Sequence, residues 1–287
     1  MIRLLFATVL FLGIGSVQRL AAESPEAATL NYKLSEGEEI RYQVEHLANT
    51  KTRIKGVDSV SSVRTVSKRV WRVKEVNAEG EMTFEHVIES VSMTQKNGDA
   101  EELSWNSESG ESPPQPFRAV ADQIGKPVAT IRINQQGQER ERLDDRGTKV
   151  DLGMGGITIP MPGQAVKIGG QWSVPRQTRV RDEDGEPKVI KIRELYTLEK
   201  VSAGIATLSI RSEPLTPIKS SKVKSQVVQQ LSNGTVKFDI DAGRLISRQL
   251  DWDETVVGFE GAESSMDYRA RLSEKLISES VRTANRK

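Results

Sequence analysis

Two histidines are the side chains of this sequence best suited to chemistry, because an imidazole can act as a base or bind a metal near neutral pH. His46 and His86 each continue a row of apolar residues that recur with a period of two. The other members of the two rows are Ile40, Tyr42, Val44, Met82, Phe84 and Ile88. A period of two places side chains on one face of a β-strand, so we expect both imidazoles on the apolar face of strands.

The histidine pair admits two interpretations. A metal site needs a third ligand, and the sequence places none beside these strands, so no metal site is predicted. Core or core-edge histidines with hydrogen-bonded ring nitrogens are the simpler interpretation. A role of His46 or His86 as a base or as a ligand contact stays open.

Other motifs with chemical potential are explained by turns. Residues 239–243 (DIDAG) and 182–185 (DEDG) resemble calcium loops but lack the distal glutamate. The glycine-rich residues 153–156 (GMGG) lie outside a strand–helix context, so no phosphate loop is predicted. With no cysteine and no nucleophile elbow, the sequence predicts no catalytic residue and no cofactor.

The elements that position these residues are predicted to be strands. Residues 235–257 show the pattern most clearly, with an alternating run, a break at Asp241-Ala242-Gly243 and a second run in which Arg248 is out of step. The apolar members of the two runs are Val236, Phe238, Ile240, Ile246, Leu250 and Trp252. Asn233-Gly234, just before, is typical of a hairpin turn. Such hairpins along the chain predict an all-β, mainly antiparallel fold.

One stretch departs from the strand pattern and predicts one short helix at residues 117–124. Its apolar residues at helical spacing are Phe117, Val120, Ala121 and Ile124, and Gly125 follows them. The apolar stripe is expected to cover the first sheet. If a ligand lies between helix and sheet, its expected contacts are Phe117, Val120, Ile124, His46 and His86.

The two halves of the chain carry similar patterns in the same order. Residues 37–42 resemble 169–172, residues 71–84 resemble 196–209, and residues 133–137 resemble 240–243. Such a repeat predicts two similar curved-sheet, half-barrel modules, at residues 23–150 with the helix and at residues 151–277, followed by a polar tail at 278–287. The alternative is that β-hairpins simply look alike.

The N-terminus resembles a secretory signal peptide. Arg3 precedes an apolar run over residues 4–14, and Leu20-Ala21-Ala22 offers a cleavage site after Ala22, which predicts a signal at residues 1–22. An uncleaved membrane anchor is the alternative. No later run predicts a transmembrane helix. A cysteine-free exported chain of this size indicates a periplasmic or secreted bacterial protein.

The charge balance argues against one class of partner. The chain has 41 basic and 40 acidic residues and a formal net charge of +1. Nucleic-acid binding calls for a strongly basic face, so no nucleic-acid partner is predicted.

Three segments together carry a resemblance to known proteins: EGEEIRYQVE (36–45), PGQAVKIGGQW (162–172) and GTVKFDIDAGRLIS (234–247). The combination resembles an uncharacterised bacterial family of secreted β-rich domains of unknown function. Its members look like long antiparallel sheets wrapped part-way round a helix, similar to the LolA/LolB lipoprotein carriers. The resemblance implies a half-barrel fold and no catalytic residues, because the family has none assigned. The second half of this sequence lacks the corresponding helix pattern.

We therefore expect an exported, non-enzymatic protein that binds an apolar or amphipathic ligand, a hydrophobic small molecule or a lipid, in a half-barrel. A structural or interaction protein of the cell envelope is the alternative, and a hydrolase using His46 or His86 is the third hypothesis. A large cavity favours the first, a filled core with exposed edge strands the second, and carboxylates converging on a histidine the third.

Overall fold

The computed structural model describes residues 26–143 and 157–277 of the chain. The expected signal peptide at 1–22, its cleavage after Ala22 and the polar tail at 278–287 lie outside these residues. Strands make up 59% and helices 7% of the structure, and the strands pair antiparallel. The predicted all-β, mainly antiparallel class is confirmed.

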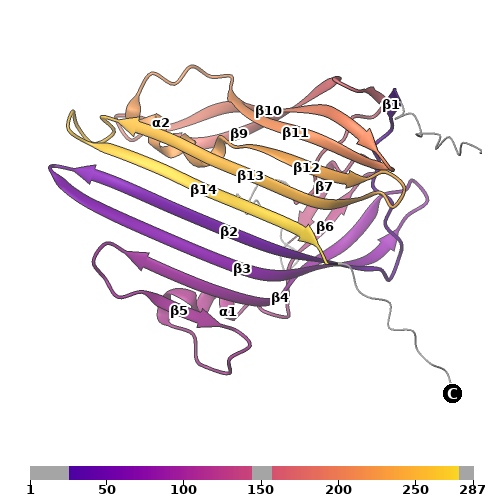
Figure 1. The fold of residues 1–287 in the computed structure, drawn as a ribbon, viewed down its shortest axis with the longest axis horizontal. Coiled ribbons are helices and arrows are strands. Elements are labelled where there is room, and N and C mark those ends of the chain that lie inside the picture. The colour runs from indigo at the N-terminus through magenta and orange to yellow at the C-terminus, as the bar shows by residue number, and fades with distance from the viewer. Residues whose placement is uncertain (1–25, 144–156, 278–287) are drawn as a thin grey trace, which may run out of the picture.

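One twelve-stranded sheet forms most of the described chain (Figure 1). Its strand order is β7-β6-β4-β3-β2-β14-β13-β12-β11-β10-β9, with β5 beside β4, while β1 and β8 form a separate pair. The strands are β1 (Ala27–Ala28), β2 (Glu39–Ile54), β3 (Val57–Val76), β4 (Met82–Asn97), β5 (Leu103–Asn106), β6 (Pro127–Ile133), β7 (Glu139–Leu143), β8 (Val166–Lys167), β9 (Gln171–Arg181), β10 (Pro187–Ser202), β11 (Ile205–Pro214), β12 (Asn233–Asp239), β13 (Arg244–Val257) and β14 (Ser265–Leu276).

The two halves of the chain meet inside this one sheet. Strand β2 of the first half pairs antiparallel with β14, the last strand of the second half. In the first half β4 pairs with β6, and in the second half β11 pairs with β12, each across a connection that carries a short helix. The halves therefore share one continuous sheet, and their origin by duplication stays a prediction.

The sheet is open but curls so that its two ends face each other. Ile131 and Ile133 of β6 share the main core with Leu198 of β10 and Leu208 of β11, although these strands lie near opposite ends of the strand order. The edge strands β7 and β9 have no pairing with each other in the part of the chain that the structure describes. The face that carries this core is called the inner face below.

One predicted turn lies inside a strand instead. Asn233 and Gly234 pair with β11 on one side and β13 on the other, so the expectation of a hairpin turn there is wrong. A Cβ at Gly234 would lie 2.1 Å from the carbonyl oxygen of Gln249. The glycine therefore allows the neighbouring backbones to approach closely, which is a common reason for glycine in a strand.

Two short helical segments pack on the inner face (Figure 1). The first consists of η1 (Gln115–Phe117) and α1 (Arg118–Ala121), so the predicted helix at 117–124 exists but ends sooner. The second consists of α2 (Ser221–Val227) and η2 (Val228–Gln230). The expectations of a single helix, and of none in the second half, are wrong.

Helix α2 is stabilised by a cap at its N-terminus and by the packing of one face against the sheet. The Ser220 side chain accepts a hydrogen bond from the Val223 N–H at 3.4 Å, as an N-cap does. Val223 and Val227, one turn apart, pack against Ile190 and Ile192 of β10. The sequence pattern hid this helix because valine is more typical of strands.

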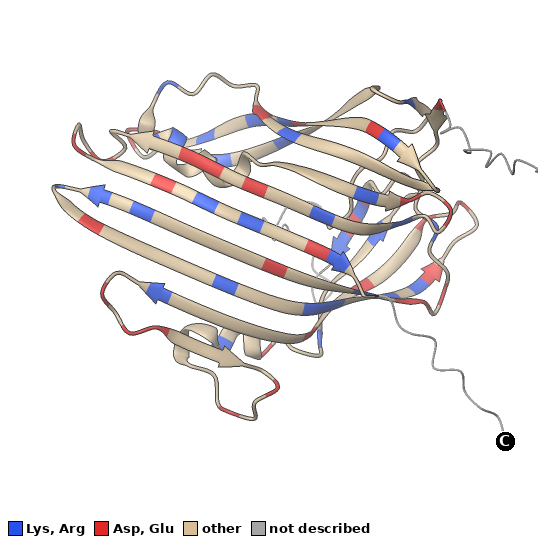
Figure 2. Cartoon of the chain, in the orientation of Figure 1, with Lys and Arg blue, Asp and Glu red and all other residues tan. Residues whose placement is uncertain are grey.

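Charged residues of both signs are interspersed along the strands (Figure 2). Arg269 pairs with Asp253 and Arg271 with Asp251 across β13 and β14. Such exposed pairs contribute about 1 kcal/mol or less each, so the sheet is held mainly by its core. Among residues 26–143 and 157–277, no helix has the length and apolar character needed to cross a membrane.

Candidate functional site

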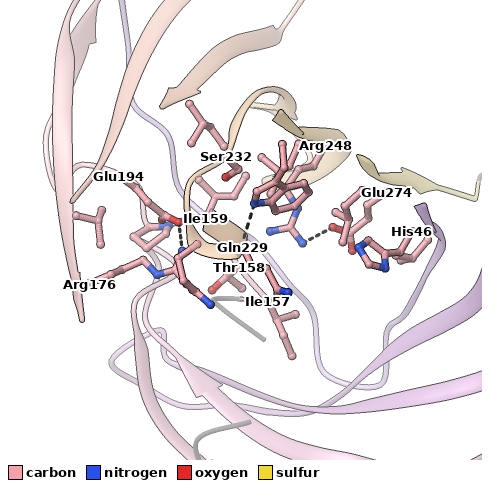
Figure 3. A pocket seen from close by; sticks show the side chains of 18 of the residues that line it. His46, Ile157, Thr158, Ile159, Arg176, Glu194, Gln229, Ser232, Arg248 and Glu274 are labelled. Carbon is pink, nitrogen blue, oxygen red and sulfur yellow. Dashed lines mark hydrogen bonds and ion pairs between the residues drawn. The ribbon is translucent and has the colours of Figure 1, made fainter. Parts of the chain in front are cut away.

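A cavity of about 720 Å³ lies on the inner face, between the sheet and residues 157–160 (Figure 3). Strands of both halves line it, together with Gln229 and Gln230 of η2. Its apolar lining includes Val44, Ile210, Leu250, Trp252 and Leu272. Its charged lining consists of Arg69, Arg176, Arg248, Glu194 and Glu274, with His46 and His86 beside them. The site thus combines apolar walls with several charged groups.

Residues 157–160 form one wall of the cavity. Three hydrogen bonds hold this segment: Ile159 N–H to Tyr32 Oη (2.9 Å), Thr158 Oγ1 to the Gly137 carbonyl (2.6 Å), and Trp172 Nε1 to the Pro160 carbonyl (2.9 Å). A buried irregular segment needs such partners for its polar groups. The predicted second module begins at residue 151, shortly before this stretch, and the structure places the stretch inside the curled sheet.

The turn at Gly137 fixes the position of this wall. Its φ is +70°, a left-handed conformation that glycine adopts without strain. A Cβ at this position would lie 2.3 Å from Tyr32 Cε2 and 2.8 Å from the Ile159 carbonyl oxygen. The close packing of turn, tyrosine ring and wall therefore requires glycine here.

Arg248 of β13 and Glu274 of β14 form an ion pair in the cavity lining. Nη2 of Arg248 lies 2.7 Å from Oε2 of Glu274, and the side chains are 15% and 6% exposed. Burial alone would lower the pKa of Arg248, but the charge of Glu274 raises it above its ordinary value. Arg248 therefore stays positively charged, and its charge is offset by the ion pair with Glu274.

Arg176 of β9 and Glu194 of β10 form a second ion pair. Glu194 also accepts a hydrogen bond from the Tyr196 hydroxyl at 2.7 Å, and Arg176 Nη2 donates to Gln230 Oε1 at 3.3 Å. Burial, together with the charge of Glu194, raises the pKa of Tyr196, so its phenol stays neutral. This network connects β9 and β10 to η2.

Arg69 of β3 is the third arginine of the cavity, and its surroundings differ. Its Nε donates a hydrogen bond to Ser67 Oγ at 3.0 Å. It forms no ion pair with a carboxylate of the described residues. Burial lowers the pKa of Arg69, and the charge of Arg248 lowers it further, while Glu274 acts in the opposite direction.

Both histidines singled out from the sequence line the cavity. Burial and the charge of Arg69 lower the pKa of both, that of His86 to about 3, so both imidazoles are neutral at pH 7. His86 is 3% exposed, and its Nδ1 has no hydrogen-bond partner among the described residues, so the expectation of hydrogen-bonded ring nitrogens is wrong for this atom. Neither histidine is bonded to a carboxylate among residues 26–143 and 157–277.

The three expected ligand contacts on the helix lie elsewhere. Phe117 is 1% exposed and shares a separate core cluster with Val91 and Trp105, and Val120 and Ile124 pack against that cluster. None of the three lines the cavity. The structure therefore brings His46 and His86 together at one site and leaves Phe117, Val120 and Ile124 outside it.

Sequence reasoning missed the charged residues of the site, although a signal for them existed. Arg248 lies in the same period-of-two row as Leu250 and Trp252, which also line the cavity, so a charged residue in an apolar row marked the site. Glu274 extends the period of Leu272 in the same way. A charged residue in an otherwise apolar row is expected to have a buried partner.

No group of three or more His, Asp or Glu side chains in the described chain is placed to hold a metal ion.

Comparisons with known proteins give little to place beside this site. No protein-family model and no curated protein matches the chain. Among solved structures, the chain is similar to one titled "Lipid-protein interactions in lipovitellin", with 10% identity and a TM-score of 0.45. The match covers 86% of this chain and 26% of that one, so this chain spans about a quarter of its length. A likeness of this level supports no functional conclusion, and the resemblance to LolA/LolB carriers stays a prediction.

Proposed function

We propose that the protein is an exported, non-enzymatic binding protein that holds an amphipathic small molecule in the inner-face cavity. The cavity itself carries the proposal. Its volume of about 720 Å³ falls within the range of roughly 300–1,000 Å³ that is typical of ligand pockets. Export is supported by the signal-like N-terminal sequence.

The lining supports an amphipathic ligand rather than a purely apolar one. Leu250, Leu272 and Trp252 offer apolar surface against which an alkyl or ring system gains free energy in proportion to its buried area. Arg69 and the two ion pairs offer groups that can orient a polar end. Binding sites of this kind combine apolar walls with a few fixed polar groups.

The same lining favours binding over catalysis. Glu194 and Glu274 form ion pairs with arginines, and no carboxylate is bonded to a histidine in the part of the chain described. His86, with a pKa of about 3, is a poor base at neutral pH because a general base works best with a pKa near the working pH.

The alternative role as an interaction protein of the envelope has one supporting observation. Strands β7 and β9 end the sheet on either side, and an edge strand presents backbone N–H and C=O groups that another chain can pair with. This role needs no ligand in the cavity, so ligand binding separates the two proposals.

The test is the binding of Nile red, a neutral solvatochromic dye, by the wild-type protein and two variants. Leu272→Trp fills the cavity, whereas Val189→Trp adds the same ring at an exposed position that does not line it. Wild type and Val189→Trp are expected to bind the dye, and Leu272→Trp is expected to bind it several-fold more weakly with an unchanged circular-dichroism spectrum. Equal binding by a folded Leu272→Trp, or no binding by wild type, would refute the proposal.

A further inference from the structure

We propose that Arg69 selects ligands with an acidic head, a carboxylate or a phosphate monoester attached to an apolar body. This inference rests on the proposed function, and it adds the chemical class of the ligand. The site is the inner face of β3, where Arg69 lines the cavity.

The charges of the cavity do not balance. Three arginines line it, Arg69, Arg176 and Arg248, together with two glutamates, Glu194 and Glu274. Each glutamate forms an ion pair with its own arginine, on β9–β10 and on β13–β14. One positive charge, that of Arg69, therefore remains without a carboxylate partner among the residues that the structure describes.

The histidines do not change this balance at neutral pH. His46 and His86 both line the cavity, and the charge of Arg69 helps to keep both imidazoles neutral. The further arginine near His86 is Arg142, which also lowers its pKa. The groups that surround Arg69 thus leave the cavity with an excess of positive charge.

The guanidinium of Arg69 has hydrogen-bonding capacity to spare. A guanidinium has five N–H donors, and that of Arg69 donates one hydrogen bond, from Nε to the Ser67 hydroxyl at 3.0 Å. Among residues 26–143 and 157–277 no acceptor is bonded to its Nη1 or Nη2 atoms. The outer edge of the guanidinium is the part that matches two oxygens of a carboxylate or a phosphate.

Burial makes an anion the fitting partner for this group. A partly desolvated charge without a counter-charge is costly, and a bound anion offsets that cost. Apolar residues such as Val44 and Leu272 also line the cavity. A free inorganic ion would lose its hydration there without gaining apolar contacts, so the lining favours an anion that is attached to an apolar body. A ligand with an acidic head and an apolar tail therefore matches both the charged and the apolar parts of the cavity lining.

The experiment compares three ligands that share one tail: dodecanoate, dodecyl phosphate and dodecanol, titrated into the full chain by calorimetry. Wild type is expected to bind one or both anions about tenfold or more tightly than the alcohol, because charge-assisted hydrogen bonds are about twice as strong as neutral ones. The two anions distinguish a carboxylate from a phosphate head.

Arg69→Gln is expected to abolish the preference for the anions, because the variant loses the attraction between the guanidinium and the anionic head. The affinity for dodecanol, which carries no charge, is expected to stay within about threefold. Arg64→Gln, on the same strand but outside the cavity lining, is the matched control and is expected to keep the preference. Arg69→Lys keeps the positive charge but lacks the planar guanidinium, so this variant is expected to retain part of the preference for the anions. It replaces Arg69→Gln in the test if Arg69→Gln fails to fold.

The outcomes separate the inference from the function on which it rests. Equal affinity of wild type for dodecanol and both anions, or an undiminished preference in Arg69→Gln, would overturn the role of Arg69 while ligand binding stands. If wild type binds none of the three ligands and no Nile red, both the proposed function and this inference fall.

Discussion

Arg248 and Glu274 are direct cross-strand partners on β13 and β14, and their Nη2 and Oε2 atoms lie 2.7 Å apart in a largely buried ion pair. The same register sets Leu250 opposite Leu272, so one alignment of the two strands supplies both apolar and charged lining. The pairing of β13 with β14 therefore specifies the part of the cavity wall that these two strands form.

Removing one member of this ion pair should destabilise the fold. Arg248→Met leaves Glu274 buried without its main counter-charge, which we expect to lower the free energy of unfolding by about 3 kcal/mol in urea melts. Arg248→Met combined with Glu274→Met should recover most of that loss. Arg271→Met, which breaks the more exposed pair with Asp251 on the same two strands, should cost less than about 1 kcal/mol. Equal losses in the two single variants would contradict this account.

Gly137→Ala should loosen the wall of the cavity. The new methyl group would meet the Tyr32 ring and the Ile159 carbonyl in addition to the strain of a positive φ. We expect a loss of about 3 kcal/mol or more in thermal or urea unfolding, against about 1 kcal/mol for Gly110→Ala. Gly110 has a similar φ of +77° but nothing within 4 Å of its added Cβ, so it isolates the backbone contribution. Similar losses at both positions would show that the wall tolerates displacement.

The buried His86 should make the protein acid-sensitive. Its pKa is about 3 in the folded state and 6.5 ordinarily, so the unfolded state binds a proton as the pH falls below 6.5 while the folded state does not. The stability is complete above pH 6.5 and declines as the pH falls toward 3. Between pH 7 and pH 5 we expect this histidine to account for a loss of about 2 kcal/mol.

Urea melts of His86→Gln at the two pH values test this expectation, because glutamine does not titrate. The variant should lack the part of the pH dependence that belongs to His86. His46→Gln is the control, and a smaller change is expected there because His46 is only half-buried. An identical pH dependence in wild type and His86→Gln would mean that the imidazole is open to water in the folded protein.

The helix at η1–α1 should behave as core rather than as a lid. Phe117 is buried against Val91 and Trp105, so Phe117→Ala should lower the free energy of unfolding by about 3–5 kcal/mol through lost contacts and a cavity. It should leave the affinity for Nile red unchanged at temperatures where the variant is folded. A stable Phe117→Ala with weakened dye binding would restore the helix to the site.

Local patterns in the sequence predicted the strands well because alternation and turns act within a few residues. The row that ends in His46 and the row around His86 both reached the inner face for that reason. The pairing of β2 with β14 was not predictable in this way, since it joins segments more than 200 residues apart and follows from the curl of the whole sheet. Without that pairing, Arg69 and Glu274 appear as ordinary surface charges on separate strands.

Two other features of the structure were not predicted from the sequence, for physical reasons. Residues 157–161 show no periodicity because they are held by hydrogen bonds to Tyr32 and Gly137 rather than by a ladder. The buried face of helix α2 consists of valines, and their preference for strands is outweighed by packing against Ile190 and Ile192. In both cases tertiary contacts decide the local structure.

The central claim is that the cavity holds a small amphipathic molecule, and native mass spectrometry of the exported protein tests it most directly. We expect the wild-type protein, purified without detergent, to carry one small molecule that is released on denaturation, and we expect Leu272→Trp to lack it while Val189→Trp retains it. The claim would be contradicted if the wild type, Leu272→Trp and Val189→Trp all showed only the mass of the polypeptide. It would also be contradicted if all three carried the same adduct.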